Sequence, residues 1–112
     1  MVIADGVLPE IIKSDVTGIV ELFLYSKFAD NIKKIILFGS FAKNSYQPDS
    51  DIDVAVVVNH KPEKNQLAEY YLIADSIRRH ADLLFCTEDQ LLSGKYVYSE
   101  ILREGITLYE NI

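Results

Sequence analysis

The sequence predicts a small α/β (α+β) domain in which helices and four short strands follow one another along a chain of 112 residues. Two observations support this class. Short runs rich in Val, Ile and Leu alternate with longer segments whose apolar residues recur at helical spacing. The chain also has the usual length of one domain and is too short for two independent cores. We therefore expect one domain over residues 1–112, with elements in the order αβ, turn, βαβααβ.

The first half of the chain predicts a helix, a strand and a long loop. Apolar residues recur at helical spacing over about residues 15–29. A β-branched and aliphatic run over 33–38 then ends at Gly39, as expected for a strand that feeds a turn. Polar residues fill positions 40–50, which predicts a loop. Such a long loop in a small domain is typically functional.

The second half predicts two more strands between helices, and a final edge strand. Each of these elements is bounded by a capping or turn residue in the sequence. We expect a strand over 51–58, a helix that opens near Pro62 and continues to about Ala81, a strand over 81–86, a helix from Thr87 to Gly94, a helix over 96–104 and a strand over 106–109.

Alternation over residues 51–58 places two aspartates on one face of a strand. Ile and Val occupy every second position, and Asp51 and Asp53 stand between them. A helix would rotate the two carboxylates by about 200°, onto opposite sides. The concentration of Val and Ile also favours a strand. We therefore expect both carboxylates to project side by side.

The charge of the chain excludes some classes of partner. Eleven basic and seventeen acidic side chains give a formal net charge of −6, so there is no broad cationic surface for a long nucleic acid. A triphosphate can still bind locally, because a few backbone N–H groups, one Lys and metal ions suffice. The longest apolar runs are far shorter than the roughly 20 residues that span a bilayer. We expect neither a long nucleic acid nor a membrane as a partner.

The single cysteine and the start of the chain predict the compartment. Cys86 cannot form an intramolecular disulfide, and no secretory signal opens the sequence. We therefore expect a cytoplasmic location. Cys86 also has no Cys or His at metal-ligand spacing, so we expect a buried, unreactive thiol.

The candidate site combines a Gly-Ser turn with the aspartate pair. Gly39 can adopt a conformation closed to other residues, so the turn can present N–H groups, and the Ser40 hydroxyl adds a donor toward phosphate oxygens. Asp51 and Asp53 are hard oxygen ligands of the type that Mg²⁺ takes together with substrate phosphates. An ordinary polar turn followed by solvated aspartates is the alternative interpretation.

A third carboxylate would complete a site for two metal ions. Two ions about 3.5 to 4 Å apart can activate an attacking oxygen and stabilise a leaving one. Asp82 is the leading candidate, because it lies at the start of the next expected strand, within reach of Asp51 and Asp53. We expect these three aspartates to be the catalytic and metal-binding residues, with Asp82 orienting or deprotonating an acceptor hydroxyl.

These residues resemble the minimal nucleotidyltransferase (MNT) family of the polymerase-β-like superfamily. The resemblance covers most of the chain and rests on Gly39-Ser40, ten intervening positions, Asp51-Ile52-Asp53 and Ala81-Asp82-Leu83-Leu84. It implies a polymerase-β-like fold with a mixed β-sheet flanked by helices. It also implies Mg²⁺-dependent transfer of a nucleoside monophosphate, with ATP as the expected donor. The family loop often reads Gly-Ser-x-Ala-Arg-Gly, and Lys43 and Asn44 stand at its last two positions here.

The resemblance also implies a partner. Members of this family are frequently paired with a HEPN-domain toxin, and in characterised pairs the nucleotidyltransferase resembles an antitoxin that adenylylates a tyrosine of the toxin. We therefore expect nucleotide binding by Gly39, Ser40 and Lys43 and a hetero-oligomer with a HEPN-type toxin. The alternative is a non-catalytic antitoxin that neutralises its partner by stoichiometric binding.

Other motifs in the chain are excluded or carry no expected chemistry. The run from Asp49 to Asp53 imitates the start of an EF-hand, but Val54 and His60 occupy its glycine and bidentate-Glu positions. No Walker A or dinucleotide-binding glycine pattern is present. His60 and His80 are expected near opposite ends of one helix, roughly 30 Å apart, as structural or solvated residues.

Overall fold

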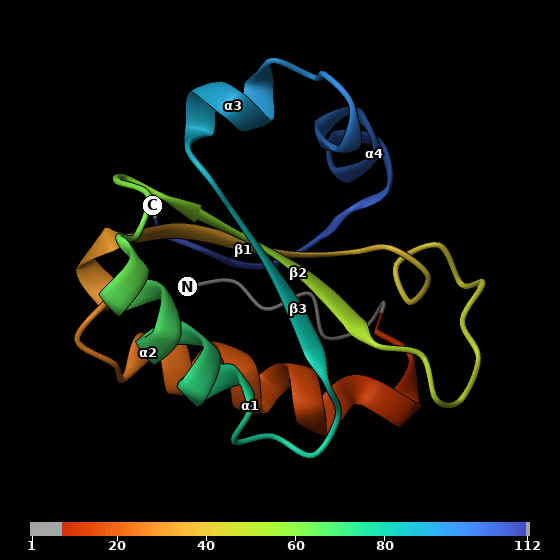
Figure 1. The fold of residues 1–112 in the computed structure, drawn as a ribbon. Helices are drawn as coiled ribbons and strands as arrows, with labels where there is room; N and C mark the ends of the chain where they lie inside the picture. The colour runs from red at the N-terminus through yellow and green to blue at the C-terminus, as the bar shows by residue number, and fades with distance from the viewer. Residues whose placement is uncertain (1–7, 112) are drawn as a thin grey trace.

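The computed structural model describes residues 8–111 and shows a four-stranded sheet with helices on both faces (Figure 1). The helices and strands appear in the predicted order. They are α1 (Lys13–Leu24), β1 (Ile32–Phe38), β2 (Ile52–Val58), α2 (Lys64–Ala74), β3 (Ala81–Cys86), α3 (Glu88–Leu92), α4 (Val97–Glu104) and β4 (Ile106–Glu110). Short 3₁₀ turns at Glu10–Ile12 and Ala29–Asn31 precede α1 and β1.

The sheet is mixed, with strand order β3-β2-β1-β4. β1 pairs antiparallel with both β2 and β4, whereas β2 pairs parallel with β3. β3 can run parallel to β2 because α2 carries the chain back across the sheet between them. The predicted fold class, a mixed sheet flanked by helices, is confirmed.

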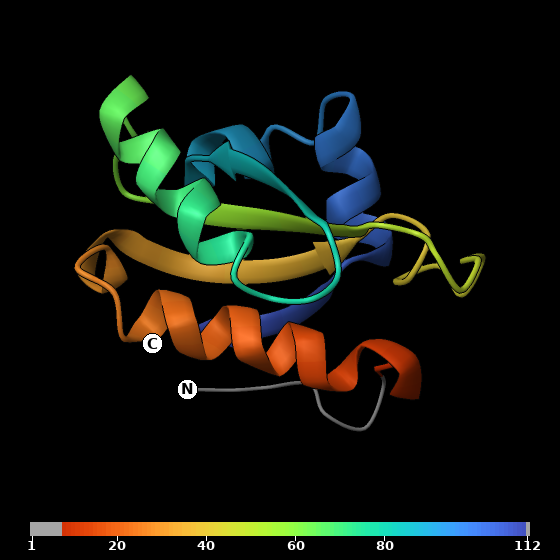
Figure 2. The same ribbon diagram turned by 60° about the horizontal axis from the view of Figure 1, so that its bottom comes forward.

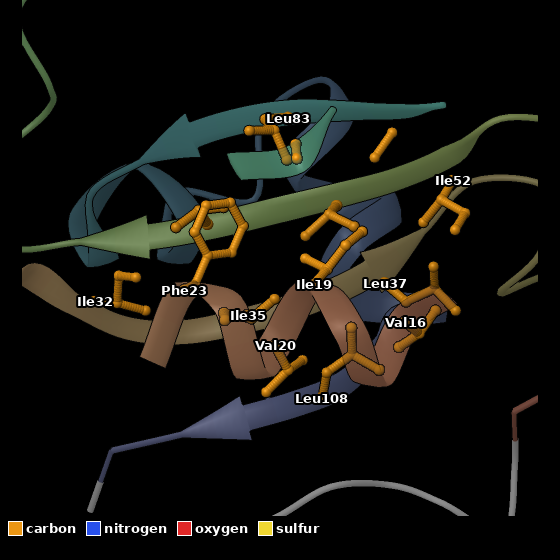
Figure 3. Close-up of a cluster of buried hydrophobic side chains, with 14 of the residues drawn as sticks. Val16, Ile19, Val20, Phe23, Ile32, Ile35, Leu37, Ile52, Leu83 and Leu108 are labelled. Atoms are coloured by element: carbon orange, nitrogen blue, oxygen red, sulfur yellow. The ribbon is translucent and has the colours of Figure 1, made fainter. Parts of the chain in front are cut away.

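Helices α1 and α2 cover one face of the sheet, and α3 and α4 cover the other (Figure 1). Figure 2 shows α1 lying across the sheet. The larger core lies under α1 and α2 and is built from aliphatic and aromatic side chains of α1 and all four strands (Figure 3). Its labelled members are Val16, Ile19, Val20, Phe23, Ile32, Ile35, Leu37, Ile52, Leu83 and Leu108. A smaller cluster fills the face under α3 and α4, with Ile36, Ala55, Val57, Cys86, Leu91 and Ile101.

Both long helices end earlier than predicted, and in both cases a serine explains the difference. After α1, the Ser26 hydroxyl donates to the Phe23 carbonyl at 2.7 Å and accepts from the Phe28 amide at 3.1 Å. After α2, the Ser76 hydroxyl donates to the Ile73 carbonyl at 2.6 Å. Serine hydroxyls that bond nearby backbone groups compete with the helical ladder. Phe28 therefore reaches the core from a turn, although its spacing fits the α1 pattern.

The ends of the shorter elements follow the predicted capping residues. The Thr87 hydroxyl and the Gln90 side chain form the expected capping box at the start of α3. Gly105 ends α4, where a Cβ would meet the Ile36 side chain and the Ile101 carbonyl, so only glycine fits there. Over residues 8–111, none of the helices combines the length and apolarity needed to cross a membrane.

Candidate active site

The predicted site residues gather where β1 ends and where β2 and β3 begin. Asp53 is paired in register with Phe38 on β1 and with Asp82 on β3. Asp53 shares the alternation of Ala55 and Val57, whose side chains pack under α3 and α4. The aspartates therefore lie on the sheet face that carries α4. The prediction that Asp82 lies on a neighbouring strand within reach of Asp53 is confirmed.

The Gly39 turn packs directly against Asp53. Gly39 has φ +76°, and a Cβ at this position would overlap the Asp53 Oδ2 and lie 3.0 Å from its Cγ. The turn continues with the Lys43 amide donating to the Gly39 carbonyl at 3.1 Å. Asn44 adopts φ 60°, the left-handed conformation that asparagine tolerates better than most other residues. Asparagine therefore adopts a left-handed conformation at the position where the family motif has glycine.

Asp51, His80 and Asp82 form a cluster of exposed ligand atoms. One atom from each of the three side chains lies within 4.8 Å of the other two. His80 Nε2 and Asp82 Oδ1 are 3.0 Å apart, and this hydrogen bond is the main cause that raises the pKa of His80. Two carboxylates and one imidazole are common ligands for divalent ions in proteins.

Asp53 adds a third carboxylate beside this cluster. Burial is the main cause that raises the pKa of Asp53, and repulsion from Asp82, Asp51 and Glu100 raises it further. Lys43 attracts the carboxylate and opposes this shift only weakly. The positive charge of Lys43 therefore does not balance the negative charges of the carboxylates at the site. A bound cation would relieve the repulsion between these carboxylates. The donor set fits a divalent metal ion.

The phosphate-binding candidate Lys43 is paired across the site with α4. Its Nζ lies 2.7 Å from Oε1 of Glu100, and this hydrogen bond raises the pKa of Lys43. Sequence reasoning did not identify Glu100, because only the packing of α4 over the sheet brings it to the loop. Ser40 contributes its carbonyl, which accepts from the Ser45 amide at 2.9 Å.

The predicted position of His80 at a helix end is wrong. His80 was expected at the end of the long helix, but α2 stops at Ala74 and His80 lies in the segment that enters β3. A single residue, Ala81, separates His80 from Asp82, and that spacing places the two side chains on one side of an extended chain. The His-x-Asp spacing at a strand start was the signal that could have found it. His60 lies elsewhere, with its backbone bonded to Asn31.

Comparisons with known proteins concern the family and the fold of the chain. The family model described as "Polymerase beta, Nucleotidyltransferase" matches residues 21–111. A Methanocaldococcus jannaschii protein named "Putative protein adenylyltransferase MJ0604" is 56% identical over 34 residues, which are 30% of this chain and 34% of that protein. The chain thus spans about a third of the length of this curated relative.

Solved structures share the fold at lower identity. A toxin–antitoxin structure with AMP-PNP is 24% identical with a TM-score of 0.61, over 86% of this chain and 73% of that chain. A complex of a tri-AMPylated HEPN toxin with MNT antitoxin from Shewanella oneidensis is 18% identical with a TM-score of 0.60, over 88% and 72% of the two chains.

The fold and the acidic cluster together define a domain of the nucleotidyltransferase class. Since the family model covers most of its length, the chain belongs to the polymerase β nucleotidyltransferase family. The predicted resemblance is confirmed at the level of the polymerase β nucleotidyltransferase family and of the fold, and a complex that contains an MNT antitoxin is among the structures similar in fold.

Proposed function

We propose that the chain transfers AMP from ATP, with Mg²⁺, onto a hydroxyl group of a partner protein, and that the acceptor is a tyrosine of a HEPN-type toxin. The observation that carries this proposal is the in-register pair Asp53 and Asp82 at the Gly39 turn, with Asp51 and His80 beside it. The names of the relatives support it: one is called a protein adenylyltransferase and one is an antitoxin bound to an AMPylated toxin.

In this proposal the carboxylates hold the metal ions and Asp82 receives a proton. Asp51, Asp53 and Asp82 would bind two Mg²⁺ ions, which when bound neutralise charge on the triphosphate and on the attacking oxygen. The acceptor oxygen forms a bond to the α-phosphorus of ATP, and the bond from that phosphorus to the bridging oxygen of the β-phosphate breaks. Pyrophosphate leaves with the bond electrons, and the hydroxyl proton passes to Asp82.

The turn and the loop hold the triphosphate in the same proposal. Gly39 brings the backbone close to Asp53, and Ser40 and Lys43 follow it at the edge of the site. Lys43 is charged and anchored by Glu100 in the absence of nucleotide. A triphosphate would compete with Glu100 for Lys43, since both present anionic oxygens. Positioning and charge neutralisation are the main contributions expected of the protein.

The acceptor is proposed to arrive on another protein. The described residues form one sheet with its covering helices, and the carboxylates of Asp51 and Asp82 are exposed on it. An acceptor side chain can therefore approach from solvent. The described residues contain no appended layer that would enclose a small acceptor. A soluble complex in the cytoplasm is the proposed setting.

The test is label transfer to the product of the neighbouring gene. The chain is incubated with that product, Mg²⁺ and ATP labelled on either the α- or the γ-phosphate. Label from α-ATP alone, with a mass increase of the partner by whole AMP units, supports the proposal. Label from γ-ATP would indicate phosphoryl transfer and contradict it. Neutralisation of the partner without label would favour the stoichiometric antitoxin, for which the Lys43–Glu100 pair is the specific support.

A further inference from the structure

We propose that Arg79 is a positioning residue, which closes the loop of residues 40–50 and thereby holds the Asp51 carboxylate in the acidic cluster. The functional part of this inference rests on the proposed function. The structural part depends only on contacts within the chain.

The Arg79 guanidinium is bound on three sides. Its Nη1 donates to two loop carbonyls, that of Pro48 at 2.7 Å and that of Ser50 at 3.0 Å. Its Nε lies 3.6 Å from Oδ2 of Asp15 on α1. Its Cζ lies 5.3 Å from the centre of the Phe41 ring. One side chain therefore connects the body of the domain to both ends of the loop.

Burial favours the pairing of Arg79 with Asp15. The side chains of Arg79 and Asp15 are only 13% and 10% exposed. A charged group so far from solvent must be paired, so the ion pair is not easily replaced by water. The planar guanidinium also fixes the directions of its donors, which a lysine ammonium cannot do.

The start of the loop is anchored through Phe41. Its ring is buried, with 1% of the residue exposed, and it stacks on Tyr46 with ring centres 4.6 Å apart. The guanidinium of Arg79 lies against the same ring. Cation–π contacts of this kind are strongest when they are desolvated. The Gly39 turn and the end of the loop are thus joined through Arg79.

The end of the loop is anchored on both sides of Asp51. Arg79 holds the carbonyl of Ser50, which precedes Asp51. The backbone carbonyl of His80 accepts from the amide of Ile52, which follows Asp51, at 3.0 Å. Asp51 therefore stands between two fixed backbone groups, and neighbouring residues of one segment supply both partners. This clamp fixes where the Asp51 carboxylate can lie relative to Asp82.

The loop has weaker support from its own contacts. The Gln47 amide donates to the Ser50 hydroxyl at 2.8 Å, and the Ser50 amide donates to the Gln47 carbonyl at 3.0 Å. These two bonds join only residues 47 and 50 to each other, so they do not tie the loop to the rest of the domain as the bonds from Arg79 do. Removing Arg79 should therefore loosen the loop without unfolding the sheet.

The experiment compares Arg79→Gln with two controls. Arg78→Gln removes the same charge from an exposed neighbour that has no such contacts. Asp15→Asn breaks the ion pair but leaves both loop carbonyls their donor. The first readout is amide hydrogen exchange of residues 44–51 in the free protein. The second is the dissociation constant for Mn²⁺, used as a spectroscopic probe for the metal site.

We expect faster loop exchange and a 10- to 100-fold weaker Mn²⁺ affinity in Arg79→Gln, as is typical when a residue that orients a ligand is removed. Arg78→Gln should match wild type in both readouts, whereas Asp15→Asn, which removes one anchor of Arg79, should show a smaller loss than Arg79→Gln and a lower melting temperature. Unchanged exchange in Arg79→Gln, or equal loss in Arg78→Gln, would overturn the positioning role. If wild type binds no Mn²⁺ the proposed function fails, and the exchange readout alone decides this inference.

Discussion

Replacing Gly39 with alanine should damage the site through a single added methyl group. The new Cβ would overlap the Asp53 Oδ2 and lie 3.0 Å from the Asp53 Cγ and 3.2 Å from its Cβ. The carboxylate would have to move by about 1 Å to restore ordinary contact, a misplacement that can reduce a rate about 100-fold. We therefore expect Gly39→Ala to lower the rate of AMP transfer by about two orders of magnitude.

The same change should lower stability by a smaller amount. Gly39 has φ +76°, and the left-handed conformation costs an alanine roughly 1–2 kcal/mol. For a domain of this size that loss corresponds to a fall in Tm of about 4–15 °C. Differential scanning calorimetry measures the stability term, and a transfer assay with labelled ATP measures the rate well below the melting transition.

Gly18→Ala is the matched control for this prediction. A Cβ at Gly18 would make an ordinary contact, 3.5 Å from the Ile77 Cγ2, inside helix α1. Alanine is preferred over glycine in a helix by roughly 0.5–1 kcal/mol, so Tm should stay equal or rise and the transfer rate should not change. A Gly39→Ala protein with the rate and Tm of wild type would refute the account of the turn.

Three further predictions concern single side chains outside the aspartate group. Glu100 holds the Nζ of Lys43 at 2.7 Å, so Glu100→Gln should release Lys43 and lower the KM for ATP several-fold. An unchanged KM would show that Glu100 does not compete with the nucleotide for Lys43. Burial raises the pKa of Cys86. The thiol of the native protein should therefore react with a disulfide reagent only in denaturant or at a pH above the ordinary thiol range. Rapid labelling of the native protein at pH 8 would contradict this. Lys33 lowers the pKa of Glu88 through a 2.9 Å contact, so the pair stabilises above the ordinary pKa of a Glu carboxyl. That stabilisation is lost as pH falls through the lowered value, and the Tm difference between wild type and Glu88→Gln should vanish at low pH.

The strands and the acidic group could be predicted from local sequence. Val and Ile at alternating positions specify β2 and the face of Asp53, and the run ending at Gly39 specifies β1. Alternation also places the start of β3 so that Asp82 can pair with Asp53. These features depend on neighbours within a few residues, which is why periodicity and turn chemistry were sufficient.

The rest of the site depends on contacts between distant segments. Glu100 reaches Lys43 only because α4 packs over the sheet, and no local pattern marks it. Arg79 was absent from the expected site because its partners on α1 and in the loop are at least 29 residues away in sequence. His80 was predicted at the wrong position because the Ser76 hydroxyl bonds the backbone and ends α2 early. The spacing of apolar residues continues beyond Ser76 and does not indicate this end.

The most direct test of the central claim compares two aspartate-to-asparagine changes that are close in sequence. Asp53→Asn alters the paired carboxylate at the Gly39 turn, whereas Asp49→Asn makes the same change at an exposed position of the loop. The measurement is the rate of AMP transfer from labelled ATP to the neighbouring gene's product, with Tm checked for both proteins. We predict loss of transfer by at least 100-fold in Asp53→Asn and a wild-type rate in Asp49→Asn. A folded Asp53→Asn protein that still transfers AMP, or equal loss in both variants, would contradict the assignment of the site.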